Sequence, residues 1–408
     1  MMLIDKDGCP DLFGSGLGVI QMIKEIQISR FKNLRHTDRL SLGKINLLAG
    51  ANGCGKSSFC QVLLCLSQTW RKGAMNNLLP QGIWKSLGNY DDIHYAYDED
   101  PTMEFLLKSD QGMYNEFKLA YRKSFSTPTL GEIENAFVNG KPIFDDSSSS
   151  DESTDGYDHA EEEEEESLLS SLSDYPNLLA LRNLYYIAAD RKAAPNKETL
   201  DETTPIDYIS PDGSNVLNVL WKYREMDVLP KIEELVKKVL EGGMIKLEPN
   251  GNDLELTINS VNNSKLFRPE NVGFGYSYIL SVLTALVISK EGSTLIVENP
   301  EAHLHPSAQA ALTNVLIDYA NINNIQLFIE THSDHVLNTL LRAVKDKKNP
   351  LTRQDIQVLF FASEKSEDGH AEARVQALEI TDGGHIQRPP KKFFEQYAID
   401  LRYLYSNS

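Results

Sequence analysis

The chain has 408 residues, of which 41% are hydrophobic and 24% are charged, an ordinary composition for a soluble globular protein. It contains no run of eighteen apolar residues and no basic stretch followed by an apolar core near its start. The sequence therefore predicts neither a transmembrane helix nor a signal peptide, and no partnership with a membrane. The formal net charge is −19, but the twelve acidic residues between positions 145 and 166 carry −12 of it. The remaining −7 gives no general basic surface for nucleic acid, so DNA binding stays open only as a local patch.

The four cysteines, Cys9, Cys54, Cys60 and Cys65, form no C-x-x-C pair. Three of them lie in or just after a glycine-rich loop, where disulfides are not expected. A reducing, cytoplasmic location fits this pattern best.

The N-terminal part reads as a loose arm (residues 1–21) followed by a lobe rich in strands (residues 22–123). Alternating apolar residues predict a strand from Ile23 to Ser29, and residues 102–108 and 115–121 predict a hairpin.

The lobe contains the pattern G-x-x-x-x-G-K-[ST] from Gly50 to Ser57. An apolar run at 44–49 precedes it, and a helical pattern at 58–66 follows it. Strand, glycine loop and helix form the context of a phosphate cradle, in which backbone N–H groups converge on the phosphates. We expect Lys56 to reach the β- and γ-phosphates of ATP and Ser57 to hold Mg²⁺. The expected nucleotide-binding residues of this loop are Asn52, Gly53, Cys54, Gly55, Lys56, Ser57 and Ser58.

Residues 124–174 differ in composition, with four consecutive serines and six consecutive glutamates. Such a polar, self-repelling segment predicts a disordered acidic insertion; the alternative is an acidic mimic that competes for a basic groove. A helical and strand subdomain is expected at 175–270. It holds a strand at 184–189 and two helices within 214–241, and it lacks the sustained heptads of a coiled-coil arm.

The second half repeats strand and helix. A glycine-rich start at Gly273 and Gly275, with Ser277, opens an apolar helix that runs to about Ile288, and such a start is a second anion-accepting end. A buried strand then ends at Glu298, and a helix begins at Pro306. The next buried strand ends at Glu330 and is followed by Thr-His-Ser-Asp. This lobe spans 271–346, and residues 347–408 form a C-terminal extension.

Carboxyl ends of parallel strands meet at one edge of a sheet, which places Glu298, Glu301 and His332 near the phosphate loop. Glu298 is expected to orient Mg²⁺ or its waters. Asn299 or Glu301 would position the attacking water, and His332 would contact the γ-phosphate.

The motifs Glu-Asn-Pro-Glu-Ala-His-Leu-His-Pro (298–306) and Glu-Thr-His-Ser-Asp-His (330–335), after a P-loop, resemble ABC-type ATPase heads of the SMC, RecF and OLD group. The chain is also similar to bacterial ATPases that close with a Gly-x-Ile and Phe-Phe pattern, here at 384–386 and 393–396. The resemblance implies an α/β P-loop NTPase head with a mixed sheet, a helical subdomain and an inserted acidic segment. It implies ATP and Mg²⁺ as ligands, and relatives include anti-phage ATPases of the Septu and PARIS systems.

Two departures from the family pattern matter. Asn299 falls where the family has its catalytic glutamate, and glycines replace the signature serine. Both features suit slow hydrolysis and a nucleotide-dependent dimerisation switch. The family's OLD nucleases continue into a Toprim domain, which is not recognisable here, so a nuclease or toxin activity would have to come from a separate effector protein.

The sequence therefore predicts an ATPase that forms a homodimer or larger homo-oligomer and controls a partner effector, with phage defence as the expected setting. One alternative is a RecF-like ATPase of DNA repair, and another is a scaffold whose nucleotide is purely structural.

Overall fold

The computed structural model describes residues 22–73, 76–110, 115–142, 181–203, 205, 208–240, 242–259, 265–346, 351–366, 368–390, 393–394, 399 and 402–404. The expected N-terminal arm (1–21), residues 143–174 of the acidic segment and most positions of the C-terminal extension after residue 390 lie outside these residues.

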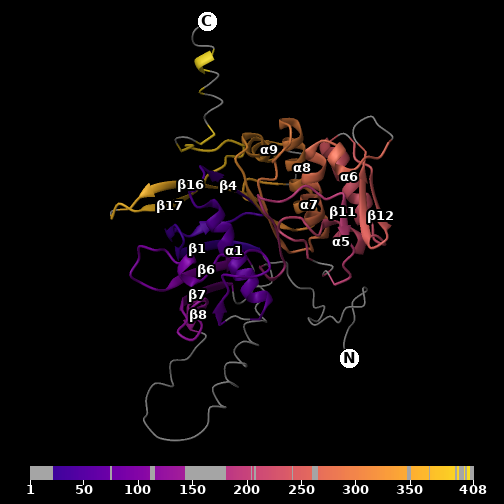
Figure 1. Cartoon of the computed structure of the whole chain (residues 1–408). Helices are drawn as coiled ribbons and strands as arrows, with labels where there is room; N and C mark the ends of the chain where they lie inside the picture. Colours follow the sequence, from indigo (N-terminus) through magenta and orange to yellow (C-terminus); the bar gives the residue numbers. More distant parts are fainter. Residues whose placement is uncertain are drawn as a thin grey trace, which may run out of the picture.

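The central sheet has six strands in the order β10-β14-β15-β4-β16-β17 (Figure 1). The first five are parallel to one another, and β17 runs antiparallel at the edge. The strand that leads into the glycine loop, β4, lies between β15 and β16, so its carboxyl end is flanked by two other strand ends. The strands are β10 (Leu184–Ile187), β14 (Thr294–Glu298), β15 (Gln326–Glu330), β4 (Ile45–Gly50), β16 (Ile356–Lys365) and β17 (Ala371–Leu378).

Each face of this sheet is buried against a different layer. Along β4, Ile45 and Leu47 point into a core shared with helices, whereas Leu48 points into the opposite core with the helix after the glycine loop. Because successive side chains of a strand point to opposite faces, a strand buried on both faces needs a continuous apolar run. The apolar runs of β4, β14 and β15 meet this need, and the predicted α/β class is confirmed.

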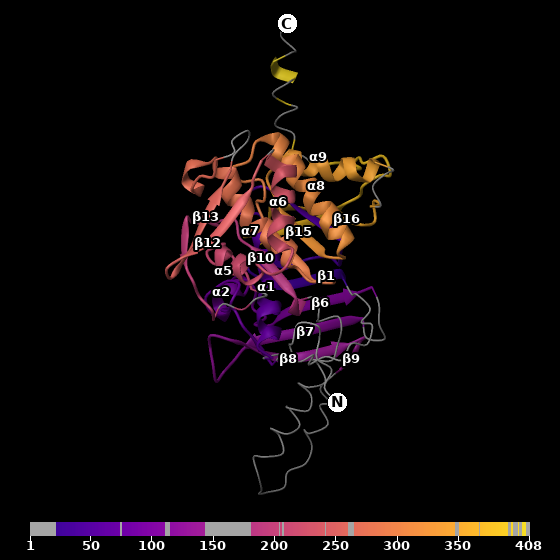
Figure 2. The same cartoon turned by 90° about the vertical axis from the view of Figure 1, so that its right-hand side faces the viewer.

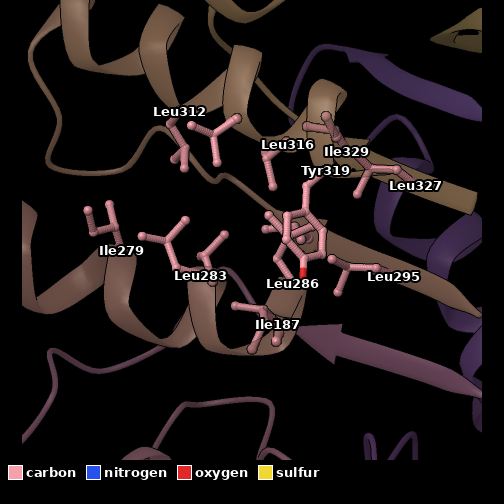
Figure 3. Close-up of a cluster of buried hydrophobic side chains, with 14 of the residues drawn as sticks. Ile187, Ile279, Leu283, Leu286, Leu295, Leu312, Leu316, Tyr319, Leu327 and Ile329 are labelled. Carbon is pink, nitrogen blue, oxygen red and sulfur yellow. The ribbon is translucent and has the colours of Figure 1, made fainter. Parts of the chain in front are cut away.

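Helices α5 (Val216–Lys222), α6 (Val228–Leu240), α7 (Phe274–Ile288), α8 (Pro306–Ile322) and α9 (Asp334–Lys345) cover one face of the sheet. Figure 3 shows α7 and α8 side chains meeting those of β10, β14 and β15, among them Leu283, Leu316, Leu295 and Leu327. Eleven of the fifteen residues of α7 are buried, which explains its nearly uninterrupted apolar sequence.

The other face is covered by α1 (Lys56–Arg71) and an antiparallel sheet in the order β2-β1-β6-β7-β8-β5 (Figure 2). The predicted hairpin is confirmed as β6 paired with β7. The smaller elements β3 (Leu40–Ser41), β9 (Lys141–Pro142) and α2 (Tyr90–Ile93) lie beside this sheet. Its main strands are β1 (Ile23–Phe31), β2 (Leu34–His36), β5 (Asn77–Leu78), β6 (Met103–Ser109), β7 (Glu116–Lys123) and β8 (Gly131–Val138).

The expected insertion boundary at residue 124 is wrong. Strand β8 lies beyond it and pairs along its length with β7, and β9 pairs with β8. The strand was missed because only alternate parts of it are buried, with Ala136 and Val138 in the core and Glu134 and Asn135 towards solvent.

A third sheet, β11-β13-β12, was not expected from the sequence. It comprises β11 (Lys197–Thr199), β13 (Asp253–Ile258) and β12 (Ile245–Asn250), and it joins the helical core through Leu254, Leu256 and Ile258. A short 3-10 turn, η1 (Pro269–Asn271), leads into α7. Within the described part of the chain, no helix has the length and apolarity required to cross a membrane.

Candidate functional site

The glycine loop between β4 and α1 has the backbone that its sequence predicts. Gly50, Gly53 and Gly55 have φ angles of 147°, 74° and 105°, which are strained for any residue with a side chain. A Cβ atom on Gly50 would collide with the carbonyl oxygen of Phe361, and one on Gly55 would lie 2.7 Å from the Cβ of Ala373. The glycines therefore allow both the turn and the close approach of β16 and β17.

Lys56 is buried, with 3% of its surface exposed, at the first position of α1. Its Nζ donates to the carbonyl oxygens of Gly50 and Ala51, at 3.0 and 2.8 Å, inside the loop that it closes. A further contact at 3.9 Å joins Nζ to Oε1 of Glu330. The ammonium group thus sits at the centre of the loop, where a phosphate could replace the two carbonyl oxygens as its partner.

Glu330 connects the end of β15 to the loop. The Ser57 hydroxyl donates to both of its carboxylate oxygens at 3.1 Å. The Cα atoms of Glu330 and Glu298 are direct partners across β15 and β14, so two carboxylates lie side by side in a buried place. Burial, and then the charge of Glu298, raise the pKa of Glu330 to about 7, against the opposing effects of Lys56 and Ser57.

Glu298 is 4% exposed, at the end of β14. Its Oε2 accepts a hydrogen bond of 3.0 Å from the backbone N–H of Ala189, whereas its Oε1 is buried without a partner. Oxygen atoms of Glu298 and Glu330 and the Sγ of Cys60 all lie within 4.8 Å of one another. A buried carboxylate oxygen without a partner, beside a second carboxylate, is a cost that a cation would relieve. The two carboxylates therefore fit Mg²⁺, whereas the thiol of Cys60 is not a ligand that Mg²⁺ prefers.

The turn after β14 carries the remaining candidates. Asn299 has a φ angle of 45°, a left-handed conformation that asparagine tolerates better than glutamate, and its Oδ1 is buried without a partner. Glu301 accepts from the Thr331 hydroxyl at 2.6 Å and from the His332 backbone N–H at 3.1 Å through Oε1. Its Oε2 has no partner. Two buried acceptor atoms without a donor, Asn299 Oδ1 and Glu301 Oε2, therefore lie in one turn.

His332 lies at the end of β15 and is exposed. Burial of part of its ring, and then the positive charge of Lys56, lower the pKa of His332, with Glu301 acting in the opposite direction. The structure thus brings Lys56, Ser57, Glu301 and His332 to one sheet edge, as the order of strand ends predicts.

Arg191, which sequence analysis did not single out, holds the turn in place. It is 3% exposed, and its guanidinium donates to the carbonyl oxygens of Glu298 and Asn299 at 2.8 Å and of Pro300 at 3.4 Å. Its Nε also reaches the carbonyl oxygen of Tyr278 in α7, at 3.4 Å. Burial lowers the pKa of Arg191 to about 10, which leaves it charged at neutral pH.

The N-terminal end of α7 only partly matches expectation. Gly273 is the exposed cap of the helix, and the following Phe274 is 71% exposed. Gly275 lies against the turn after β14, where a Cβ atom would be 3.0 Å from Leu304. Ser277 is only 3% exposed, and its carbonyl oxygen accepts from Ala194, so it does not reach the surface as a phosphate ligand would. It lies one turn into α7, on the face that packs into the molecule.

Two of these side chains were missed by sequence analysis. Glu330 was quoted only as part of a motif, although the end of a strand beside β4 was a sufficient signal. Arg191 gave no signal, because its partners are carbonyl oxygens of residues more than one hundred positions away.

The glycine loop, the paired carboxylates and the largely parallel central sheet define a P-loop NTPase fold. Residues 45–338 match the family described as "AAA domain, putative AbiEii toxin, Type IV TA system", and the chain belongs to that family. Residues 351–404 match a second family, "Protein of unknown function (DUF3696)". Comparison with curated proteins gives no significant match.

Solved structures of SMC heads are similar in fold. One, an SMC head bound to the C-terminal winged-helix domain of ScpA, has a TM-score of 0.53 at 15% identity and covers 88% of this chain and 97% of that chain. The SMC head domain from Thermotoga maritima has a TM-score of 0.45 at 12% identity, covering 88% and 99%. An SMC head bound to a ScpA domain derived from Pyrococcus furiosus has a TM-score of 0.47 at 12% identity, covering 94% and 99%. At these identities the likeness concerns the fold alone.

Proposed function

We propose that this protein is a slowly hydrolysing ATPase in which ATP binding closes two copies of the chain and thereby controls a partner effector. The supporting observation is the convergence of Lys56, Ser57, Glu298, Glu301 and His332 at one sheet edge, with Asn299 where the resemblance expects a catalytic carboxylate.

Nucleotide binding would rest on the glycine loop. Lys56 would exchange its bonds to the carbonyl oxygens of Gly50 and Ala51 for phosphate oxygens, and the N-terminal end of α1 would add its N–H groups. Ser57 and Glu298, with Glu330 beside them, would hold Mg²⁺. The ion would supply charge neutralisation on the phosphates.

Slow hydrolysis follows from the side chains in the turn after β14. An amide can orient water but cannot accept its proton, so Asn299 would act as a positioning group. Glu301 Oε2, which is buried and without a partner, would receive the proton. Its other oxygen is held by Thr331 and by the backbone N–H of His332, which fixes the direction of the carboxylate.

Dimerisation would complete the site from outside. The exposed start of α7, with Gly273 and Phe274, would face the nucleotide held by the second copy. Because Gly275 packs against the turn after β14, movement of α7 would reach that turn directly. The SMC heads of two of the similar structures are bound to ScpA domains, which illustrates how such a head can hold a further protein.

Single-turnover hydrolysis tests the chemistry. We expect Asn299→Glu to speed ATP cleavage about tenfold or more and Glu301→Gln to slow it by about 10²-fold, the range of a lost general base. Asn299→Gln is the matched control for side-chain size, and because it adds no carboxylate it should not speed cleavage. Unchanged rates in both test variants would refute these roles.

The effector would be a separate nuclease or toxin, and the biological setting would be anti-phage defence. The family's description, which names a toxin and a toxin–antitoxin system, supports this setting. Affinity purification of the tagged chain with ATP and without it should recover one protein in a nucleotide-dependent manner. Recovery of recombination proteins instead would favour a role in DNA repair.

A further inference from the structure

A pocket of about 540 Å³ lies at the end of α1 opposite the glycine loop. It is lined by side chains from α1, from the residues that precede β10 and from two loops. The lining residues include Arg71, Lys72, Ile83, Arg182, Asn183 and Tyr208. A volume of this size is within the usual range for small-molecule sites.

The lining combines cations with flat apolar surface. Arg71 and Lys72 end α1, and within the described chain no carboxylate lies within 4.0 Å of either charged group. Tyr208 and Ile83, which is 42% exposed, provide the apolar side, and the Tyr208 hydroxyl donates to the Ile83 carbonyl oxygen at 3.1 Å. Arginine pairs with phosphate through a planar fork, and an aromatic ring offers a stacking face.

The Arg71 guanidinium is already oriented. Its Nε donates to the carbonyl oxygen of Arg182 at 2.9 Å, and its Cζ lies 5.0 Å from the centroid of the Trp84 ring. Tyr208 packs on the same indole at 5.7 Å. A pre-positioned guanidinium loses less entropy when it binds an anion.

We propose that this pocket binds a small organic anion that consists of a phosphoryl-type group on a flat ring. Arg71 and Lys72 bind the charged group, and Ile83 and Tyr208 contact the ring.

Three consecutive residues connect the pocket to the nucleotide site. Ile83 lines the pocket, Trp84 is buried and donates to the Ser67 hydroxyl at 3.1 Å, and Lys85 reaches the Tyr186 hydroxyl at 3.5 Å. The positive charge of Lys85 also acts on Glu330. A ligand that moves this short segment changes the position of a cation near the carboxylate pair. The pocket thus modulates nucleotide affinity, a consequence that rests on the proposed function.

Isothermal titration of the full chain with 1-naphthyl phosphate tests the site. We expect one binding event per chain, and the same event in Lys56→Ala, where the glycine loop is impaired. Inorganic phosphate, which lacks the ring, and 1-naphthol, which lacks the phosphoryl group, should each bind at least tenfold more weakly. Because the titration needs no ATP, its result stands even where the proposed ATPase function fails.

Variants locate the binding. Arg71→Gln should weaken it at least tenfold. Lys72→Gln, at an exposed position, should weaken it several-fold without a change in folding. Lys237→Gln removes the same charge from the exposed face of α6 and should leave it unchanged. Equal affinity in all three variants would overturn the proposal.

The effect of the pocket ligand on ATP affinity is measured in a separate titration. Saturating 1-naphthyl phosphate should change the affinity for ATP at least fivefold in the wild type, a typical coupling, and Lys72→Gln should need a several-fold higher ligand concentration for the same change. An ATP affinity that does not respond would overturn the connection through residues 83–85.

Discussion

The two ends of the candidate site differ in how fully their groups are satisfied. At the glycine loop, Lys56 and Ser57 are bonded within the chain, to two carbonyl oxygens and to Glu330. At the start of α7, Gly273 and Phe274 face solvent, and Phe274 exposes 71% of its surface. The glycine loop therefore contains its own set of binding groups, whereas the start of α7 exposes a surface that does not form a complete site.

This difference is the reason to expect a second copy of the chain at the start of α7. Single exposed apolar residues are common on protein surfaces, so Phe274 does not by itself require a cover, but it offers apolar surface at the exposed end of α7. Phe274 lies near His303 of the turn after β14, with ring centroids 6.1 Å apart, so a second copy that covers Phe274 would lie beside this turn. The substitutions below change the glycine loop, the turn after β14 or the start of α7.

The largest effect is expected from Lys56→Ala. The substitution removes the cation at the centre of the loop, and the affinity for ATP should fall by about 10²-fold or more, as expected for charge-assisted bonds in a buried place. Lys44→Ala is the control, because Lys44 lies just before β4, at the strand end away from the glycine loop, and its Nζ donates to Asn321 and Asn324. An ATP affinity of Lys56→Ala within twofold of wild type would show that the glycine loop does not bind the nucleotide.

Arg191→Met should cost about 3 kcal/mol of unfolding free energy, because the carbonyl oxygens of Glu298, Asn299 and Pro300 would lose their donor. Denaturant unfolding measures the loss. Lys192→Met, at the exposed neighbouring position, should lower the unfolding free energy far less, because a surface ion pair contributes little. Equal stabilities of the two variants would show that Arg191 does not hold the turn.

Ligand-free stability should depend on pH through Glu330. Its pKa is about 7 in the fold, above the unfolded value near 4.5, so the folded state binds the extra proton. The free energy of unfolding that Glu330 contributes is therefore fully present below about pH 4.5. It is lost as the pH rises to about 7, and the loss is at most about 3 kcal/mol. Unfolding in EDTA measures it, and Glu330→Gln should flatten this part of the profile. An unchanged slope in the variant would contradict the assignment.

The smallest effect is expected from Phe274→Ala. It should weaken ATP-dependent self-association about tenfold while it leaves monomer stability and ATP affinity unchanged, because the side chain is exposed in the single chain. Sedimentation at several protein concentrations gives the dissociation constant. Exposed Ile322→Ala, at the end of α8, provides the control, since it removes a similar apolar surface elsewhere.

Much of the fold was predictable, because β4, β14 and β15 are short apolar runs between turn signals and the glycine loop has a fixed backbone. Strands β8, β11 and β12 were not, since their mostly exposed or half-buried residues carry too weak an alternation, whereas the regular alternation of β13 was a signal that sequence analysis missed. Among the site residues, strand ends located Glu298 and His332. Ser277 was placed wrongly, because one helical turn decides whether a side chain faces solvent or core. Arg191 stayed hidden, since its contacts are made with distant backbone.

Light scattering of the purified chain with Mg²⁺ and ATP is the most direct test of the central claim, with Glu301→Gln used to slow turnover. The account predicts a monomer without nucleotide, a dimer with ATP and a monomer in Lys56→Ala under both conditions. A chain whose mass is the same with ATP and without it, while ATP is bound, would contradict the switch.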